Sequence, residues 1–220
     1  MPKAVILDFD GTIADTIPAI AEGINLTMEL YGFPTHDEAA VRTFINNGPR
    51  MLIRRALPKE LQDDEALLDR VLADYNRLYQ TVCHHTDRPY DGICDLIDTL
   101  RERGYRIGVL SNKQDALVRV MCERVIPNRC DALQGSLPDK PTKPDPYLTG
   151  LVADALGVSP AECVIVGDSD VDIRTAQLAG MAHIGVSWGY RDEAFLRENG
   201  ARVVVSTPKE LLSEIEKLNG

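Results

Sequence analysis

Short runs of apolar residues, rich in valine and isoleucine, recur along the chain, and each run ends at a small or polar residue. Uninterrupted runs of this kind are typical of strands that are buried on both faces of a parallel sheet. The predicted strands are Ala4–Leu7, Ile107–Leu110, Cys163–Val166, Ile184–Val186 and Val203–Val205.

Segments with helical spacing of apolar residues lie between the later strands. Ile93, Ile97 and Leu100 share one face of a predicted helix over 93–101, and Gly104 follows as a stop. Further helices are predicted at Pro146–Leu156, Val171–Ala179 and Lys209–Leu218. Alternation of strands and helices predicts an α/β fold, with a Rossmann-like parallel sheet covered by helices on both faces.

The interval after the first strand breaks this alternation. It contains only helical patterns, near 17–31, 37–45, 49–57 and 61–84, and it is too long for an ordinary crossover. We therefore expect an inserted, all-helical cap domain over 15–88. Residues 1–14 and 89–220 would then form the α/β core domain.

The composition narrows the functional class. The chain has 220 residues, with 24 Lys and Arg against 34 Asp and Glu, which gives a net charge of −10. This balance argues against binding of nucleic acid or an anionic membrane, which both require basic patches. Five scattered cysteines without a C-x-x-C pair and the lack of a run of ~20 apolar residues favour a cytoplasmic protein without disulfides or a membrane span. We expect a monomer or a homodimer.

Polar side chains follow three of the predicted strands, and a lysine precedes the helix that leads to one of them. In open α/β sheets, ligands bind beyond the carboxyl ends of the strands. We therefore expect these side chains to converge on one site. They are Asp8, Asp10, Ser111, Asn112, Lys143, Asp168, Asp170 and Asp172.

Carboxylates and one lysine in a single crevice suit a divalent cation better than an apolar ligand. Oxygen ligands favour Mg²⁺, which commonly bridges protein carboxylates to a phosphate. Ser111 and Lys143 are candidates for holding the phosphate oxygens. One of the paired aspartates could attack as a nucleophile and form an acyl-phosphate, while its neighbour acts as an acid and then as a base.

Each of these features has an ordinary structural explanation when it stands alone. An Asp-x-Asp turn is often simply solvated, Ser and Asn are common helix-cap residues, and Lys140 is a rival to Lys143. A calcium loop that starts at Asp168 is excluded, because Ile173 and Ala179 occupy the positions where such a loop needs Gly and Glu. The convergence of all these elements at strand ends is what indicates chemistry.

Taken together, the motifs resemble those of the haloacid dehalogenase-like hydrolases. The first motif of that family, D-x-D-G-T, matches Asp8–Thr12, and the second matches Ser111-Asn112. The third matches Lys143, and the fourth, G-D-x-x-x-D, matches Gly167–Asp172. The resemblance covers essentially the whole chain, including the helical insertion, and Ser111-Asn112-Lys113 looks most like the phosphoglycolate phosphatase branch.

The resemblance implies a role for each matched residue. Asp8 would be the nucleophile and Asp10 the general acid and base. The transferring phosphoryl group would be bound by Ser111, Asn112 and Lys143. Mg²⁺ would be held by Asp8, the backbone carbonyl of Asp10 and Asp168, with Asp172 supporting it directly or through water. The second aspartate also separates this sequence from the dehalogenases of the family, which lack it.

The insertion contains a loop similar to the one with which caps of this family select their substrates. Asn47 and Gly48 lie in this loop, and Gly48 would permit a close backbone approach. Arg50 could clamp a second anion of the substrate, such as a carboxylate. The alternative, an exposed arginine at a helix N-terminus, remains equally open.

The resulting functional hypothesis is a magnesium-dependent phosphatase that hydrolyses a small phosphorylated metabolite through an aspartyl-phosphate. Phosphoglycolate is the nearest substrate of the family. The alternatives are a phosphomutase on the same scaffold, which returns the phosphoryl group to a sugar, and a non-enzymatic receiver or phosphate-binding module, which would not turn over.

Overall fold

The protein divides into two compact units. The computed structural model describes residues 1–45, 48–86 and 88–218. Met1–Asp15 and Arg88–Gly220 form one unit, here called the core unit, and Thr16–Asp87 forms the other, here called the helical unit. That the two units are separate domains, with the helical one acting as a cap, stays a prediction.

Over its described residues, the core unit is built on a parallel sheet of six strands in the order β3-β2-β1-β4-β5-β6. The strands are β1 Ala4–Leu7, β2 Arg106–Gln114, β3 Ala132–Ser136, β4 Cys163–Gly167, β5 Ala182–Val186 and β6 Val204–Val205. The predicted α/β class with a Rossmann-like parallel sheet is confirmed. The sequence prediction missed β3, an edge strand whose residues Ala-Leu-Gln-Gly-Ser do not form an apolar run.

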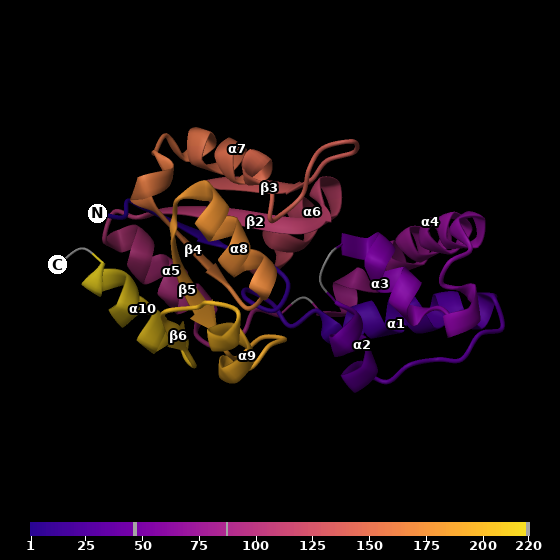
Figure 1. The fold of residues 1–220 in the computed structure, drawn as a ribbon. Coiled ribbons are helices and arrows are strands. Elements are labelled where there is room, and N and C mark those ends of the chain that lie inside the picture. The colour runs from indigo at the N-terminus through magenta and orange to yellow at the C-terminus, as the bar shows by residue number, and fades with distance from the viewer. Residues whose placement is uncertain (46–47, 87, 219–220) are drawn as a thin grey trace. The chain divides into compact units, whose positions relative to one another are not determined.

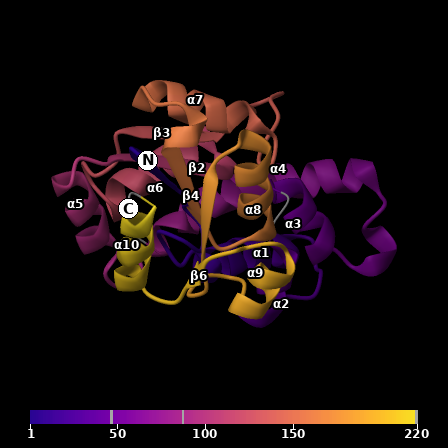
Figure 2. The same ribbon diagram turned by 60° about the vertical axis from the view of Figure 1, so that its left-hand side comes forward.

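Helices cover both faces of this sheet. α7 and α8 pack on one face, whereas α5 packs on β2 from the other and is joined there by α10 (Figures 1 and 2). The helices of the core unit are α5 Ile93–Glu102, α6 Asp115–Val125, α7 Pro146–Leu156, η3 Pro160–Glu162, α8 Asp170–Ala179, α9 Glu193–Glu198 and α10 Pro208–Lys217.

The core under α7 fixes the direction of the side chains at the end of β1. Ala4 and Ile6 belong to a buried cluster with Leu148 and Val152 of α7. Successive side chains of a strand alternate between its faces, so Asp8 continues the row of Ala4 and Ile6. The first strand therefore delivers Asp8 to the sheet edge on the side of α7 and α8.

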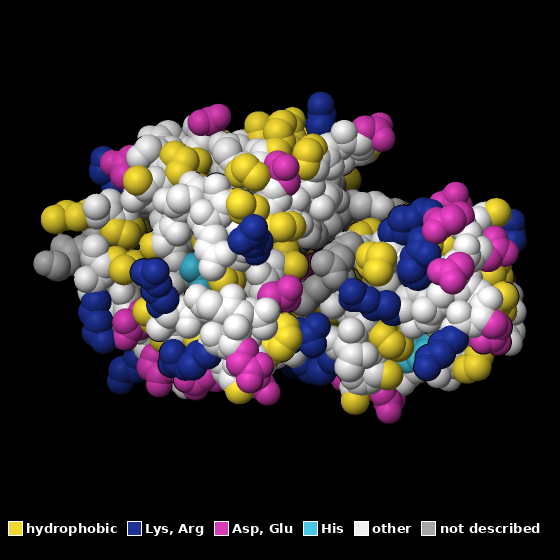
Figure 3. Space-filling view, viewed as in Figure 1, with side chains coloured by type: hydrophobic (Ala, Val, Ile, Leu, Met, Phe, Trp, Pro, Cys, Tyr) yellow, Lys and Arg dark blue, Asp and Glu magenta, His cyan; other side chains and the backbone are white. Residues whose placement is uncertain are grey.

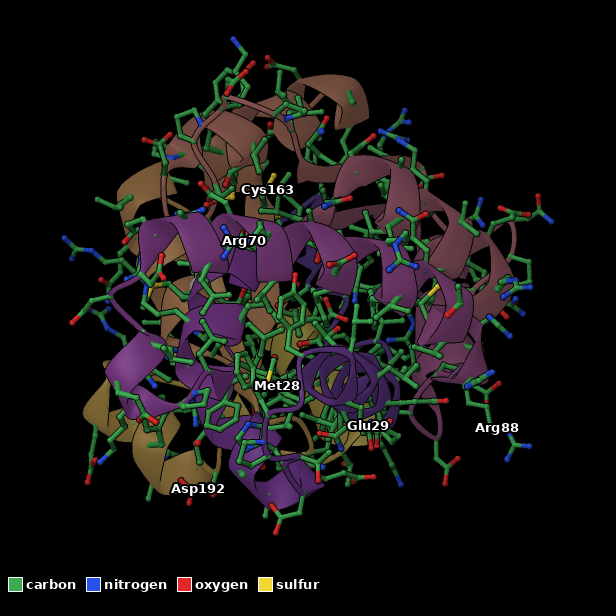
Figure 4. All side chains as sticks on the ribbon, turned by 90° about the vertical axis from the view of Figure 1, so that its right-hand side faces the viewer. Met28, Glu29, Arg70, Arg88, Cys163 and Asp192 are labelled. Carbon is green, nitrogen blue, oxygen red and sulfur yellow. The ribbon has the colours of Figure 1, made fainter. Side chains whose placement is uncertain are left out.

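The helical unit packs around its first and last helices. Its elements are α1 Ile17–Leu30, α2 Glu38–Phe44, α3 Gly48–Ala56, η1 Lys59–Leu61, α4 Glu65–Val82 and η2 Cys83–Thr86. Gly23 of α1 lets α4 approach closely, because a Cβ there would lie 3.0 Å from Tyr79. Met28 is fully buried inside this unit, whereas its neighbour Glu29 is exposed (Figure 4).

None of the helices among the described residues combines the length and the apolar character that crossing a membrane requires.

Candidate active site

The turn after β1 places two aspartates around a buried aromatic ring. The backbone N–H of Asp8 donates to the carbonyl of Val166 at 2.9 Å, so the strand is still paired with β4 where the turn begins. Phe9 is fully buried, as its position between the two aspartates predicts. The N–H groups of Ile13 and Ala14 both donate to the carbonyl of Phe9, at 3.0 and 3.1 Å, and close the turn.

Three carboxylates from two strand ends and one helix meet at this point. Asp8, Asp168 and Asp172 each offer an oxygen within 4.8 Å of the others. The Lys143 ammonium lies 2.9 Å from Asp8 Oδ1 and 2.7 Å from Asp172 Oδ1. The side chains of Lys143 and Asp172 are 3% and 0% exposed, so this ion pair is formed away from solvent.

Burial dominates the electrostatics of the cluster. It raises the pKa of Asp8 well above its usual value, and Asp172 and Asp168 add to this rise while Lys143 opposes it. Burial and the charge of Asp172 raise the pKa of Asp168 to about 7. Burial disfavours the charge of Lys143, but Asp172 and Asp8 outweigh it, so that its pKa is raised overall.

The N-terminus of α8 holds Asp172 in place. The Ser169 hydroxyl donates to Asp172 Oδ2 at 2.6 Å, and the backbone N–H of Asp172 donates back to Ser169 Oγ at 3.3 Å. Both carboxylate oxygens of Asp172 are thus engaged, one by Ser169 and one by Lys143. Gly167 is required beside them, because a Cβ there would lie 2.2 Å from Asp172 Cγ.

The end of β2 contributes a buried hydroxyl and an amide. Ser111 is 1% exposed, and its Oγ accepts the backbone N–H of Lys113 at 3.1 Å. Asn112 binds the backbone of Lys143 at both ends, since its Oδ1 accepts the N–H at 2.8 Å and its Nδ2 donates to the carbonyl at 3.1 Å. Asn112 therefore holds the segment that carries Lys143, a contact that the predicted phosphate-binding role did not foresee.

The loop after β5 closes on the turn after β1. The backbone N–H of Tyr190 donates to Asp168 Oδ2 at 2.6 Å, and the Trp188 indole donates to the carbonyl of Thr12 at 3.1 Å. A Cβ at Gly189 would lie 2.2 Å from the carbonyl oxygen of Gly11, so only glycine permits this approach. Sequence reasoning did not find these contacts, because the Tyr190 donor is a backbone N–H and the Trp188 acceptor is a backbone carbonyl, and backbone groups leave no residue-type signal.

The donor set fits a divalent cation such as Mg²⁺. Among the described residues, the cluster combines three carboxylates, of which Asp168 and Asp172 are buried, with the Lys143 ammonium, which contacts Asp8 and Asp172; the cluster is therefore short of positive charge. Burial first, and the neighbouring carboxylates second, raise the pKa values of Asp8 and Asp168. A hard cation bound by the carboxylate oxygens would supply the missing positive charge.

The predicted specificity residues lie in the helical unit. Gly48 begins α3 with a φ of +82°, and Asn47 lies outside the described residues. The Arg50 guanidinium binds Asp69 and Glu65 of α4, each at 2.5 Å. Basic and acidic side chains lie next to one another on the face that Figure 3 shows. Arg50 therefore has carboxylate partners of its own, and its role in substrate selection stays a prediction.

Sequence comparison places the chain in a hydrolase family. The family profile described as Haloacid dehalogenase-like hydrolase matches residues 5–186. A phosphoglycolate phosphatase of Rhodospirillum rubrum is 31% identical over 88% of this chain and 83% of its own length. A phosphoglycolate phosphatase of Pseudomonas syringae pv. tomato is 29% identical over 96% of this chain and 79% of its own length.

Comparison with solved structures agrees with the sequence comparison. A protein of Lactobacillus delbrueckii subsp. bulgaricus, provisionally assigned as a phosphoglycolate phosphatase, superimposes with a TM-score of 0.90 and 32% identity. The match covers 97% of this chain and 98% of that one. The chain belongs to the haloacid dehalogenase-like hydrolases. It is an enzyme of the phosphoric monoester hydrolase class, similar to phosphoglycolate phosphatases, which argues against the receiver alternative.

Proposed function

We propose that this enzyme hydrolyses a small phosphomonoester through a phosphorylated aspartate at Asp8. The observation that carries the proposal is the buried cluster at the end of β1, where Asp8 shares Lys143 with Asp172 and lies within 4.8 Å of Asp168. A carboxylate held between a lysine and a divalent-cation site is protected from water and aimed by fixed partners.

In the first half of the reaction, a carboxylate oxygen of Asp8 attacks phosphorus and the ester P–O bond breaks. Asp10, at the rim of the turn and 20% exposed, gives a proton to the departing alkoxide. In the second half, Asp10 takes a proton from water, the water oxygen attacks phosphorus, and the carboxylate of Asp8 is regenerated.

The remaining residues bind and orient the phosphoryl group. Lys143, in the segment before α7, and Ser111, in the last part of β2, would hold its oxygens. Asp8, Asp168 and the backbone carbonyl of Asp10 would hold Mg²⁺, with Asp172 in support. Bound there, the cation would neutralise charge on the phosphoryl oxygens.

The first candidate substrate is phosphoglycolate. The support for it is the name of two relatives that match most of the chain, and a fold by itself names no substrate. A mutase would use the same residues, and its product separates it from a phosphatase. A cytoplasmic location stays a prediction from composition.

The test is a phosphate-release screen over phosphomonoesters, with Mg²⁺ or with a chelator. Wild type is expected to release phosphate repeatedly with Mg²⁺, and Asp8→Asn is expected to be inactive. Asp154→Asn is the matched control, because Asp154 is exposed on α7, away from the cluster. Equal turnover by Asp8→Asn and wild type would refute the nucleophile, and formation of an isomer without phosphate release would favour the mutase.

Cation binding has an independent readout in thermal unfolding. Mg²⁺ is expected to raise the Tm of wild type, since a ligand that binds only the folded state stabilises it. The rise should disappear in Asp168→Asn and persist in Asp154→Asn. An equal rise in all three proteins would place the cation elsewhere.

A further inference from the structure

A second lysine, outside the cluster around Asp8, is buried against the other catalytic aspartate. The Lys113 ammonium donates to Asp10 Oδ1 at 2.5 Å. The side chain of Lys113 is only 7% exposed, whereas that of Asp10 is 20% exposed. The proposed reaction assigns no task to this lysine.

The backbone around Lys113 is held firmly. Its N–H donates to Ser111 Oγ at 3.1 Å, and the pairing of β2 with β3 shifts register between Leu110 and Gln114. Gly135 of β3 is pressed against this segment, since a Cβ there would lie 2.7 Å from the carbonyl oxygen of Lys113. The irregular end of β2 thus fixes the backbone position from which the Lys113 side chain extends.

Burying a lysine is unfavourable, because the ammonium loses water and the long side chain loses rotational freedom. An ion pair at 2.5 Å offsets part of that penalty, and at a partly buried site such a pair restrains both partners. The ion pair thereby restrains rotation of the Asp10 carboxylate about its last bond. A group that transfers protons works best when its oxygen is already aimed at the reacting atom.

We propose that Lys113 is a positioning residue for Asp10. This inference rests on the function proposed above, in which Asp10 is the general acid and base. The ammonium holds Oδ1, and one oxygen of a carboxylate is enough to carry a proton. Lys113 itself exchanges no proton with the substrate and forms no bond to phosphorus.

The test compares Lys113→Met, which keeps the length of the side chain without its charge, with Lys113→Arg, which keeps the charge. Lys140→Met is the matched control, because Lys140 is an exposed lysine of the same unit. kcat/KM is measured, since it reports the first phosphoryl transfer, in which the acid protonates the leaving group. Three substrates are used: phosphoglycolate, glycerol phosphate and 4-nitrophenyl phosphate.

Lys113→Met is expected to lower kcat/KM by about 10- to 100-fold on the two alkyl phosphates, whose alkoxides leave poorly without a proton. On 4-nitrophenyl phosphate, which needs no acid, the loss should stay within about threefold. Lys113→Arg should recover most of the activity, and Lys140→Met should match wild type. In the background of Asp10→Asn, Lys113→Met should have little further effect, because the two residues act as one unit.

Two results would overturn the inference. An equal loss on all three substrates would mean that Lys113 supports the fold or attracts phosphate in general. A loss confined to phosphoglycolate would mean that Lys113 binds the substrate carboxylate directly. In both cases wild type still turns over, so the proposed function survives, whereas activity in Asp8→Asn would refute the function itself.

Discussion

Replacing Gly11 by alanine adds a single methyl group at the point where the turn after β1 meets Asp168. Gly11 has a φ of +82°, and a Cβ built there lies 2.3 Å from Asp168 Oδ2 and 2.7 Å from Asp168 Cγ. Both atoms belong to a carboxylate that is 1% exposed and hydrogen-bonded to the loop after β5. Neither side of the contact is free to move.

The Gly11→Ala substitution is expected to reduce both stability and activity, for two separate reasons. A left-handed backbone conformation costs an alanine roughly 1–2 kcal/mol relative to glycine. Ordinary van der Waals contact begins near 3.4 Å, so the methyl group and the oxygen must separate by about 1 Å. A displacement of about 1 Å at a catalytic group can reduce activity by about 100-fold.

Gly104→Ala is a matched control for the first of these two reasons. Gly104 has a φ of +85°, and, its two chain neighbours aside, none of the residues that the structure describes lies within 4 Å of its Cβ position. It should therefore suffer the same backbone penalty, a fall in Tm of about 2–8 °C, while its activity stays at the wild-type level. Gly11→Ala should fall further in Tm and lose about 100-fold in kcat/KM on its best substrate.

Thermal unfolding, circular dichroism and steady-state kinetics of the three proteins check this reasoning. A folded Gly11→Ala protein with kcat/KM within about threefold of wild type would show that Asp168 does not need its observed position. A comparable loss of activity in Gly104→Ala would show that the backbone penalty, and not the contact with Asp168, is responsible.

Three further predictions concern the surroundings of the site and the rest of the core unit. Asn112→Ala removes both hydrogen bonds to the backbone of Lys143, at 2.8 and 3.1 Å, and should lower kcat/KM by about tenfold, which steady-state kinetics will measure. Phe9→Ala deletes a fully buried ring and should reduce the free energy of unfolding by about 3–5 kcal/mol in denaturant titrations. The pKa of Glu162 is lowered to about 2, and the contact with Lys3 is the largest cause. As the pH falls, the Glu162 carboxylate therefore becomes protonated in the unfolded chain before it does in the folded protein. Stability should therefore decrease between about pH 5 and pH 2, and Glu162→Gln should flatten that part of the Tm profile; an unchanged profile would contradict the assignment.

The sequence predicts the parts of the fold that depend on apolar patterning. Ala4–Leu7 and Pro146–Leu156 have the predicted bounds because their apolar residues are buried. The edge strand Ala132–Ser136 was missed because only part of it is buried, and half-buried residues carry no clear pattern. The helices Asp115–Val125 and Glu193–Glu198 were also not predicted.

At the site, residue types predicted the convergence but not the contacts that hold it. The paired aspartates and Asp168 can be found from the sequence because carboxylates that directly follow apolar strands are unusual, and Lys143 because it precedes the helix that leads to one of these strands. The partners of these groups cannot, because the Tyr190 backbone N–H and the restriction at Gly189 depend on how distant loops meet. Lys113 follows the recognised motif Ser111-Asn112, but only its distance to Asp10 in the structure shows that the two side chains form an ion pair.

The position of β1 has a consequence for how the protein is made. β1 is the first strand of the chain, yet it pairs with β2, which starts at Arg106, and with β4, which starts at Cys163. During synthesis, Asp8 therefore leaves the ribosome long before either neighbouring strand exists. Among the contacts of the site described above, the hydrogen bond from Tyr190 to Asp168 involves the residue that is made last. A nascent chain shorter than about 190 residues would carry Asp8 and Asp168 and still lack the Tyr190 N–H that holds the Asp168 carboxylate.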